Sequence, residues 1–321
     1  TGKIKGIRFL CHNCFSTIDA EFTMTGKRKQ CPHCGNAFKV PKPSIECGEL
    51  FGDYLIDHFI GEGGMGEVYM AKHVNDGKVA ALKIIRPSVI NDEEIEHFRN
   101  EIRMNLRVSH VNFVKAFEAG VDNKGRHFLA MEYIKGRSLE GYMLKRGRFD
   151  EDHALRIART VAEALKATWD KWRIIHRDIK PENILITQAN VVKIMDLGIS
   201  TPQFASLKEK EIIGTPYYMS PEQIENPSEI DQRTDIYSLG ATLYEMLTGV
   251  EPFNAKETDE IFRQVVEEEP RPPREMRPQL SSATCGLIRR FMSKDMKDRP
   301  QDWDVAIAEI KEALRYCSEL S

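Results

Sequence analysis

The sequence lacks a long hydrophobic run, because none of its apolar stretches approaches the roughly 18 residues that a membrane-spanning helix requires. The opening segment TGKIKGIRFL is basic but has no long apolar core, which argues against a secretory signal. The formal net charge is only −3, so no global field would draw the whole chain onto nucleic acid or an anionic membrane. We also find no internal repeat and no low-complexity tract. These absences indicate a globular protein with no membrane segment in this chain.

Cysteine is scarce and unevenly placed, which argues against a disulfide scaffold. Four of the seven cysteines lie within the first 34 residues, and the other three are scattered at Cys47, Cys285 and Cys317. This distribution favours a reducing compartment. The chain does not begin with methionine, so we expect that flanking segments are missing from it.

The composition, with 41% hydrophobic and 30% charged residues, is ordinary for a globular protein, and 321 residues suggest one large domain or two. The pattern changes near VPKPSIEC, where Pro41 and Pro43 resist both helix and central strand. We interpret residues 44–52 as a linker. The block before it, residues 1–43, carries eight Lys and Arg residues against two acidic residues, a formal charge of +6.

Beyond the linker, predicted strands come first and predicted helices follow. Strands are expected at YLIDHFI, GEVYMAKHV, KVAALKIIR and HFLAMEYI. A helical stripe at spacings of three and four is formed by Ile95, Phe98, Ile102 and Leu106. Further helices are predicted over 150–171, 220–225, 232–248, 258–267, 281–292 and 302–316. A strand-rich half followed by a helix-rich half implies an α+β protein with two lobes, and ligands often bind where such halves meet.

Two C-x2-C pairs in the first block form a candidate zinc site. CHNC and CPHCG supply Cys11, Cys14, Cys31 and Cys34, with 16 residues between the pairs. Tetrahedral Zn²⁺ binds four thiolates in this arrangement, whereas disulfide bonds or a chance pattern are the alternatives. Because 43 residues provide little core, we expect the metal to supply folding energy to this block. The segment, with its CPHCGNAFKVP ending, resembles a zinc ribbon.

Four cysteines would complete the metal shell, so His12 and His33 are not expected to be ligands. The role of the ribbon is open at this point. Its positive charge suggests contact with nucleic acid, but such an excess is more often a solvated face, and we favour a protein-docking or regulatory module.

The segment IGEGGMGEVY contains the pattern Gly61-x-Gly63-x-x-Gly66-x-Val68, which alone is weak evidence for a phosphate site. Strand-like residues lie on both sides of it. This favours a hairpin lid over phosphates, not the strand-to-helix turn of a dinucleotide-binding fold. A flexible hairpin turn is the alternative interpretation.

Lys83 follows Gly66 by 17 residues, within the apolar strand VAALKII. A buried lysine is costly unless its ammonium group meets anionic partners, and Glu101 on the predicted helix is a candidate partner. The alternative is that both residues are surface charges.

The segment HRDIKPEN, residues 176–183, places charge between two short apolar runs. By itself it is compatible with a solvated turn or with a loop that holds a proton acceptor and a metal ligand. Together with the glycine loop, Lys83, MDLG and SPE, it resembles protein kinases over a span from about Tyr54 to about Ala313. Lys180 is typical of the serine/threonine class, and GEGGMGEVY and GTPYYMSPEQ resemble bacterial members.

The resemblance implies a two-lobed protein-kinase fold preceded by the small zinc ribbon. The kinase domain would occupy residues 53–318, with a β-rich N-lobe at about 53–134 and an α-helical C-lobe at about 135–318. It would be a serine/threonine protein kinase that transfers the γ-phosphoryl group of ATP to protein hydroxyls, including its own, with Mg²⁺ or Mn²⁺. The alternatives are a kinase-like scaffold that binds nucleotide without turnover, or a regulatory zinc-ribbon module.

By the same resemblance, residues of the catalytic loop have distinct roles. Asp178 would accept or orient the proton of the substrate hydroxyl, and Lys180 would neutralise charge on the transferring phosphoryl group. Asn183 and Asp196 would hold Mg²⁺, a hard cation that prefers oxygen ligands. Alignment and charge neutralisation would supply most of the rate.

The nucleotide would be held mainly by the other lobe. Lys83, oriented by Glu101, would bind the α- and β-phosphates under the glycines of the loop. Backbone groups of Glu132 and Ile134 would bond the edge of adenine. The candidate apolar walls, which are also ordinary core residues, are Ile60, Val68, Ala81, Met131 and Leu185.

Other motif residues would be structural. The resemblance implies that His176 is a packed residue and that Asp235 anchors the catalytic loop from a helix. It also implies that Glu222 and Arg299 form a buried ion pair.

The activation segment departs from the commoner pattern. MDLG places Leu197 where phenylalanine is usual, and SPE replaces A-P-E. Arg177 is typical of kinases controlled by phosphorylation of this segment, yet residues 199–214 offer few hydroxyl groups. Ser206 is the candidate phosphosite, and Thr215 would line the substrate site.

The expected partners are protein substrates with serine or threonine, with a docking partner or nucleic acid at the ribbon. We expect a cytoplasmic location, or a place in the cytoplasmic part of a longer membrane-anchored receptor kinase.

Overall fold

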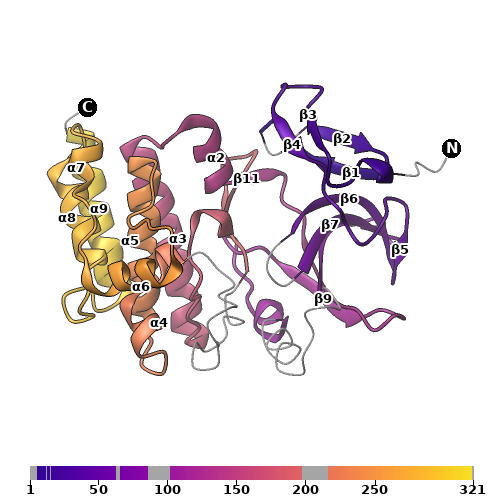
Figure 1. Ribbon diagram of the computed structural model, residues 1–321. Helices are drawn as coiled ribbons and strands as arrows, with labels where there is room; N and C mark the ends of the chain where they lie inside the picture. Colours follow the sequence, from indigo (N-terminus) through magenta and orange to yellow (C-terminus); the bar gives the residue numbers. More distant parts are fainter. Residues whose placement is uncertain are drawn as a thin grey trace. The chain divides into compact units, whose positions relative to one another are not determined.

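The computed structural model describes residues 6–11, 13–14, 16–62, 66–85, 102–196 and 216–319. The chain divides into two compact units, which are drawn together in Figure 1. The first unit comprises Thr1–Arg107 and Val114–Lys135, and the second comprises Val108–Phe113 and Gly136–Ser321. The first is rich in strands and the second in helices, as the sequence predicts. Within the described ranges, no helix combines the length and apolarity needed to cross a bilayer.

The first unit is built on one large sheet, whose main path runs β2-β1-β6-β7-β8-β10-β9. Neighbouring strands are antiparallel except for β1 and β6, which pair in parallel. A short strand β5 also pairs with β6, and β3 pairs with β4 in a separate hairpin. The strand bounds are β1 Ile7–Leu10, β2 Thr17–Ala20, β3 Arg28–Gln30, β4 Ala37–Lys39, β5 Leu50–Phe51, β6 Tyr54–Glu62, β7 Gly66–His73, β8 Val79–Ile85, β9 Ala116–Val121 and β10 His127–Glu132.

The two faces of this sheet carry different side chains, because successive residues of a strand point to opposite sides. Tyr69, Leu82 and Ala130 share one face and are completely or almost completely buried. They belong to a hydrophobic core that also contains side chains from β1 and β2. The opposite face presents Lys83, with Val68 directly across from it on β7.

Residues 44–52, predicted as a linker, pack along this sheet. Ile45 is buried in the shared core, and its backbone N–H donates to the Tyr69 hydroxyl at 3.2 Å. Gly48 and Glu49 exchange backbone hydrogen bonds with Ile56 of β6. The segment therefore follows the sheet from the four-cysteine block into β6.

The second unit is a helical assembly around α5, which is buried along almost its whole length. Helix α5 packs against α3 and α8, and α9 packs against α3 and α8. The helix bounds are α2 Leu139–Arg146, α3 Glu151–Trp172, α4 Pro221–Glu225, α5 Gln232–Thr248, α6 Thr258–Glu267, α7 Pro273–Met276, α8 Ser282–Phe291 and α9 Trp303–Glu319. Six of these lie close to the predicted ranges, whereas the short helices α2 and α7 were not predicted.

A small sheet in the same unit carries the polar loop. Strands β11 Gly136–Ser138, β12 Ile184–Thr187 and β13 Val192–Ile194 pair in the order β11-β12-β13. The one-turn helix η3, Pro181–Asn183, leads directly into β12. The loop between α3 and β12 is therefore fixed at both ends by regular structure.

Candidate active site and metal centre

The segment HRDIKPEN lies between the end of α3 and the start of β12, in the second unit. His176 is completely buried, and its Nδ1 accepts the backbone N–H of Asp178 at 3.3 Å. This leaves the proton on Nε2, which donates to the Met195 carbonyl at 3.2 Å. Burial lowers the pKa of His176 to about 4, so the ring is neutral near pH 7. His176 therefore braces the loop, in agreement with the structural role that the sequence suggests.

Asp235 of α5 holds the same loop by hydrogen bonds to the loop backbone. Its carboxylate accepts the N–H groups of His176 at 2.7 Å and Arg177 at 2.8 Å. Arg177 has a φ of 68°, a left-handed conformation that is unfavourable for a residue with a Cβ. The Arg177 carbonyl also accepts the side-chain amide of Gln223 at 3.0 Å. Three hydrogen bonds thus stabilise a backbone conformation that the chain alone would not favour.

The functional side chains of the loop converge on Asp178. The Asn183 amide donates to the Asp178 carboxylate at 2.7 Å and to its carbonyl at 2.9 Å. The ammonium group of Lys180 lies 3.0 Å from the other carboxylate oxygen. The Asp178 side chain is about one-third exposed. An acid, an amide and a cation therefore meet at one accessible point.

Asp196 lies just after the β12–β13 hairpin. Ile184 pairs with Ile194 in this hairpin, and the Met195 N–H donates to the Asn183 carbonyl at 2.9 Å. Asn183 and Asp196 therefore lie at the same end of the hairpin. Asp196 has a φ of 52°, a second left-handed residue next to the catalytic loop. The arrangement provides a carboxylate and an amide oxygen, the ligand types that Mg²⁺ prefers.

Glu222 and Arg299 form a bidentate ion pair deep in the second unit, with N···O distances of 2.7 and 2.8 Å. Burial would raise the pKa of Glu222, but the Arg299 guanidinium outweighs it and lowers the pKa below its usual value. Thr234 donates to the same carboxylate at 2.8 Å. Glu222 lies on α4 beside Gln223, and both members of the pair bond to α5, which carries Asp235, so the pair stabilises the support of the catalytic loop.

In the first unit, the glycine loop connects two antiparallel strands. Gly61 pairs with Val68, and Glu62 pairs with Glu67. This register confirms strands on both sides of the loop, as the sequence predicts. A Cβ on Gly66 would lie 2.1 Å from the Ile84 carbonyl oxygen, so this position requires glycine for packing. Gly63 falls outside the described residues.

Lys83 lies on the central strand β8, between Val68 of β7 and Leu129 of β10. Ala81 pairs with Met131 two residues away, so these side chains share the face of Lys83. The sheet therefore groups four of the predicted nucleotide-binding residues on one side.

The other predicted nucleotide-binding residues lie elsewhere. Ile60 is half-buried near the end of β6, and Glu132 ends β10. Ile134 follows β10, and Leu185 is half-buried on β12 in the second unit. Glu101, Leu197, Ser206 and Thr215 lie outside the described residues.

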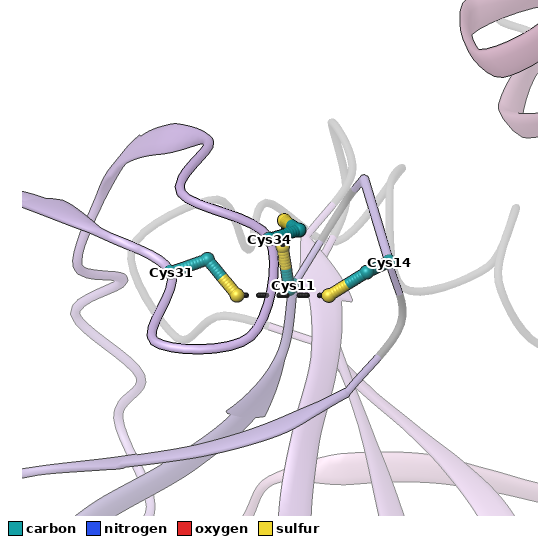
Figure 2. A group of neighbouring side chains, drawn as sticks. All are labelled: Cys11, Cys14, Cys31 and Cys34. Atoms are coloured by element: carbon teal, nitrogen blue, oxygen red, sulfur yellow. Dashed lines mark hydrogen bonds between the residues drawn. The ribbon is translucent and has the colours of Figure 1, made fainter.

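The four cysteines of the first block converge, as Figure 2 shows. Their sulfur atoms all lie within 4.8 Å of one another. Cys11 Sγ is 3.8 Å from Cys34 Sγ, and Cys14 Sγ is 3.6 Å from Cys31 Sγ. These separations are far longer than a disulfide bond of about 2.05 Å, so the cysteines are free thiols here. They do match the edge of about 3.8 Å of a tetrahedron with Zn–S bonds of about 2.3 Å.

The surroundings of the cluster favour thiolate at its accessible positions. The side-chain hydrogen bond between Cys14 and Ser16 contributes most to lowering the pKa of Cys14, which falls to about 6. The backbone N–H of Asn36 and the amide of Asn13 lower the pKa of Cys34. The donor set and its geometry therefore fit a soft divalent cation such as Zn²⁺.

Comparison with known proteins decides the family. The protein kinase domain family matches residues 54–314, most of the chain. The chain belongs to this family. The kinase domain is 35% identical over 271 residues to the serine/threonine-protein kinase pkn3 of Myxococcus xanthus, covering 80% of this chain and 49% of that protein. It is 35% identical over 257 residues to a probable serine/threonine-protein kinase PknB of Corynebacterium glutamicum, covering 78% of this chain and 40% of that protein.

The chain thus spans about half or less of the length of these curated relatives. Its fold is similar to that of the Mycobacterium tuberculosis PknI kinase domain, whose crystal structure matches with a TM-score of 0.68 at 23% identity, over 84% of this chain and 100% of that one. The two-lobed protein-kinase fold, with a β-rich N-lobe and a helical C-lobe, is therefore confirmed. The four-cysteine cluster before it is consistent with a zinc ribbon.

Two polar contacts that support the glycine loop or the catalytic loop were not foreseen from the sequence. Gln223 bonds the catalytic loop from α4, and only its place in the SPEQ motif could have drawn attention to it. Ser44 bonds to the buried carboxylate of Glu67 through both its N–H and its hydroxyl. This second contact joins residues that are 23 positions apart, so no local sequence pattern predicts it.

Proposed function

We propose that this kinase domain transfers the γ-phosphoryl group of ATP to serine and threonine hydroxyls of proteins, including its own. The observation that supports this most directly is the convergence of Asn183 and Lys180 on the accessible carboxylate of Asp178. The backbone of the loop that carries these side chains is held by hydrogen bonds to Gln223 of α4 and Asp235 of α5. Such preorganisation is what phosphoryl transfer requires, because the reaction depends on positioning and charge neutralisation.

Asp178 would accept or orient the proton of the attacking hydroxyl. Its carboxylate oxygens are fixed from two sides by Asn183 and Lys180. The Lys180 ammonium supplies positive charge beside the acceptor and would offset charge on the transferring group. Neutral His176 is turned toward the Met195 carbonyl, so it would hold the loop and take no proton from the substrate.

Asn183 and Asp196 would hold Mg²⁺, which would neutralise the phosphate oxygens when bound. The Asn183 amide nitrogen is committed to Asp178, so its side-chain oxygen is the atom left to meet a cation. In the N-lobe, the sheet face with Val68, Ala81, Lys83 and Met131 would bind the nucleotide. The lysine would bind the phosphates, and the apolar side chains would pack against the adenine base.

The four cysteines would bind one structural Zn²⁺. Thiolates at these separations satisfy a closed tetrahedral shell, which leaves no open position for catalysis. The exposed residue His33 is not part of the cluster.

The decisive experiment is phosphoryl transfer from labelled Mg-ATP to a generic protein substrate and to the kinase itself. We expect labelled serine and threonine with the unchanged protein. The variant Asp178→Asn should bind nucleotide with nearly unchanged affinity but transfer almost no label. Transfer by the unchanged protein that does not exceed that of the variant would refute the proposed activity.

A further inference from the structure

The four-cysteine block and the N-lobe sheet share one backbone ladder. Strand β1 pairs in parallel with β6 at Phe9 and Phe59, so the hairpin β1–β2 continues the N-lobe sheet (Figure 1). Phe9 lies two residues before Cys11, and Phe59 lies two residues before Gly61. The first metal-ligand candidate and the glycine loop are therefore connected through a single pair of strands.

The two parts also share one core. Cys11 and Cys31 are only 1% and 2% exposed, and both belong to the cluster that contains Tyr69 and Leu82 of the N-lobe. Phe9 packs edge-on against Phe38 of β4 at 5.4 Å between ring centroids. Cys11 and Cys31 are thus part of the hydrophobic core that covers the buried face of the sheet. If the cysteines lost this arrangement, apolar side chains of both the four-cysteine block and the N-lobe sheet would become exposed to water.

A polar clamp adds a second connection just after the ribbon. Glu67 is the residue that follows Gly66, and its buried carboxylate accepts the Ser44 N–H at 3.0 Å and the Ser44 hydroxyl. Tyr69 donates its hydroxyl to the same carboxylate and accepts the N–H of Ile45. If the ribbon loosened, this buried carboxylate would lose two of its donors, which is costly in a low-dielectric interior.

We propose that a thiophilic divalent cation at the four cysteines is a structural part of the nucleotide-binding sheet, so that metal occupancy controls the rigidity of strands β6 and β7. The sequence predicts only that the metal supplies folding energy to residues 1–43. The shared ladder, core and clamp imply that strands β6 and β7 loosen with the ribbon. Metal-free protein would retain its C-lobe and bind nucleotide more weakly. The nucleotide part of this inference rests on the proposed function, whereas the loosening of the sheet does not.

The test uses the whole chain, first analysed for bound zinc by atomic emission. Backbone amide exchange is then followed before and after removal of zinc with a chelator, without nucleotide or Mg²⁺. We expect one zinc per chain, and after its removal about tenfold faster exchange in residues 6–40 and in 54–73. Helix α5 is the internal reference and should keep its protection. Added Zn²⁺ should restore the slow exchange, and added Mg²⁺ should not.

Faster exchange confined to residues 6–40, with 54–73 as protected as before, would overturn the proposal. So would native protein that contains no thiophilic metal. Failure of the zinc-loaded chain to bind nucleotide would count against the proposed kinase function instead, since the exchange measurement needs no nucleotide.

A pair of variants tests the same link through binding. Cys34→Ser removes an exposed ligand without opening a buried cavity, and Cys285→Ser changes a half-buried cysteine of the C-lobe outside the cluster. We expect nucleotide affinity to fall several-fold in the first variant and to stay unchanged in the second. Equal affinity of the two variants, with zinc absent from Cys34→Ser, would also overturn the proposal.

Discussion

Asn183 donates its side-chain amide to two acceptors on Asp178, the carboxylate at 2.7 Å and the backbone carbonyl at 2.9 Å. The amide therefore fixes both the position of the acid and the backbone that carries it. It also determines which atom of Asn183 faces away from Asp178. One residue thus links the proposed acceptor of the substrate proton to the side of the loop that would meet a cation.

Replacing Asn183 with alanine should reduce the rate of phosphoryl transfer more than it weakens substrate binding. The Asp178 carboxylate would lose a fixed hydrogen bond, and the cation site would lose an oxygen. We expect kcat to fall by about 10² or more, since loss of one preorganised group at a charged transition state has effects of this size. Steady-state kinetics with varied Mg²⁺ would measure it. Gln188→Ala, at the exposed turn of the same hairpin, is the control, and an equally small effect in both variants would contradict the assigned role.

His176 and Asp235 should affect stability oppositely as pH changes. Burial lowers the pKa of His176 from 6.5 to about 4, so its contribution to stability is present above pH 6.5 and is lost as pH falls toward 4. Burial raises the pKa of Asp235 from 3.8 to about 7, so its contribution is present below 3.8 and is lost as pH rises toward 7. Each shift corresponds to roughly 3–4 kcal/mol at most, and the two contributions oppose each other between about pH 4 and 6.5.

Single variants should reveal this opposition. With Asp235→Asn, we expect stability to fall more steeply than in the unchanged protein as pH drops from 6.5 to 4, because the histidine acts alone. With His176→Asn, stability should instead fall more steeply as pH rises over the same range. Urea unfolding at several pH values gives the slopes, and all other titrating groups are common to the three proteins. Parallel stability curves for all three would disprove the pKa shifts.

The parts of the structure that were predictable depend on local patterns. Helix α5 was predicted over 232–248 and is found at Gln232–Thr248, because Asp231 caps its start and Gly249 takes the left-handed conformation at its end. The catalytic loop was recognisable because its chemistry requires particular residues at fixed spacing. Short elements such as α2 were missed, since eight residues hold too little periodic signal.

What could not be predicted was the pairing between distant segments. Strand β1 has only four residues, and nothing in them specifies a parallel partner about 50 positions later in the chain. The bond between Ser44 and Glu67 is equally non-local. For this reason the ribbon seemed to be a separate module behind a linker, whereas the structure joins it to the N-lobe core.

Breaking the buried ion pair should destabilise the C-lobe strongly. Glu222→Gln leaves the Arg299 guanidinium buried without its charge partner, and such losses cost about 3–5 kcal/mol. Chemical unfolding monitored in the C-lobe measures the change. Arg156→Met is a matched control, because its pair with Asp152 is exposed on α3 and should contribute little to stability. Similar losses in the two variants would show that burial does not determine the value of the Glu222 pair.

The two ends of the glycine loop should respond differently to the same substitution. A Cβ on Gly66 would lie 2.1 Å from the Ile84 carbonyl oxygen and 2.9 Å from its carbon, both backbone atoms that cannot move aside cheaply. A Cβ on Gly61 would meet nothing within 4 Å. We therefore expect Gly66→Ala to lower N-lobe stability by about 1–3 kcal/mol, the usual cost of overpacking, and Gly61→Ala to leave it nearly unchanged. Thermal unfolding without nucleotide isolates this packing effect from any effect on phosphate binding. If both variants unfold at the same temperature as the unchanged protein, Gly66 is not required by the packing of β7 against β8, and its role is limited to the loop.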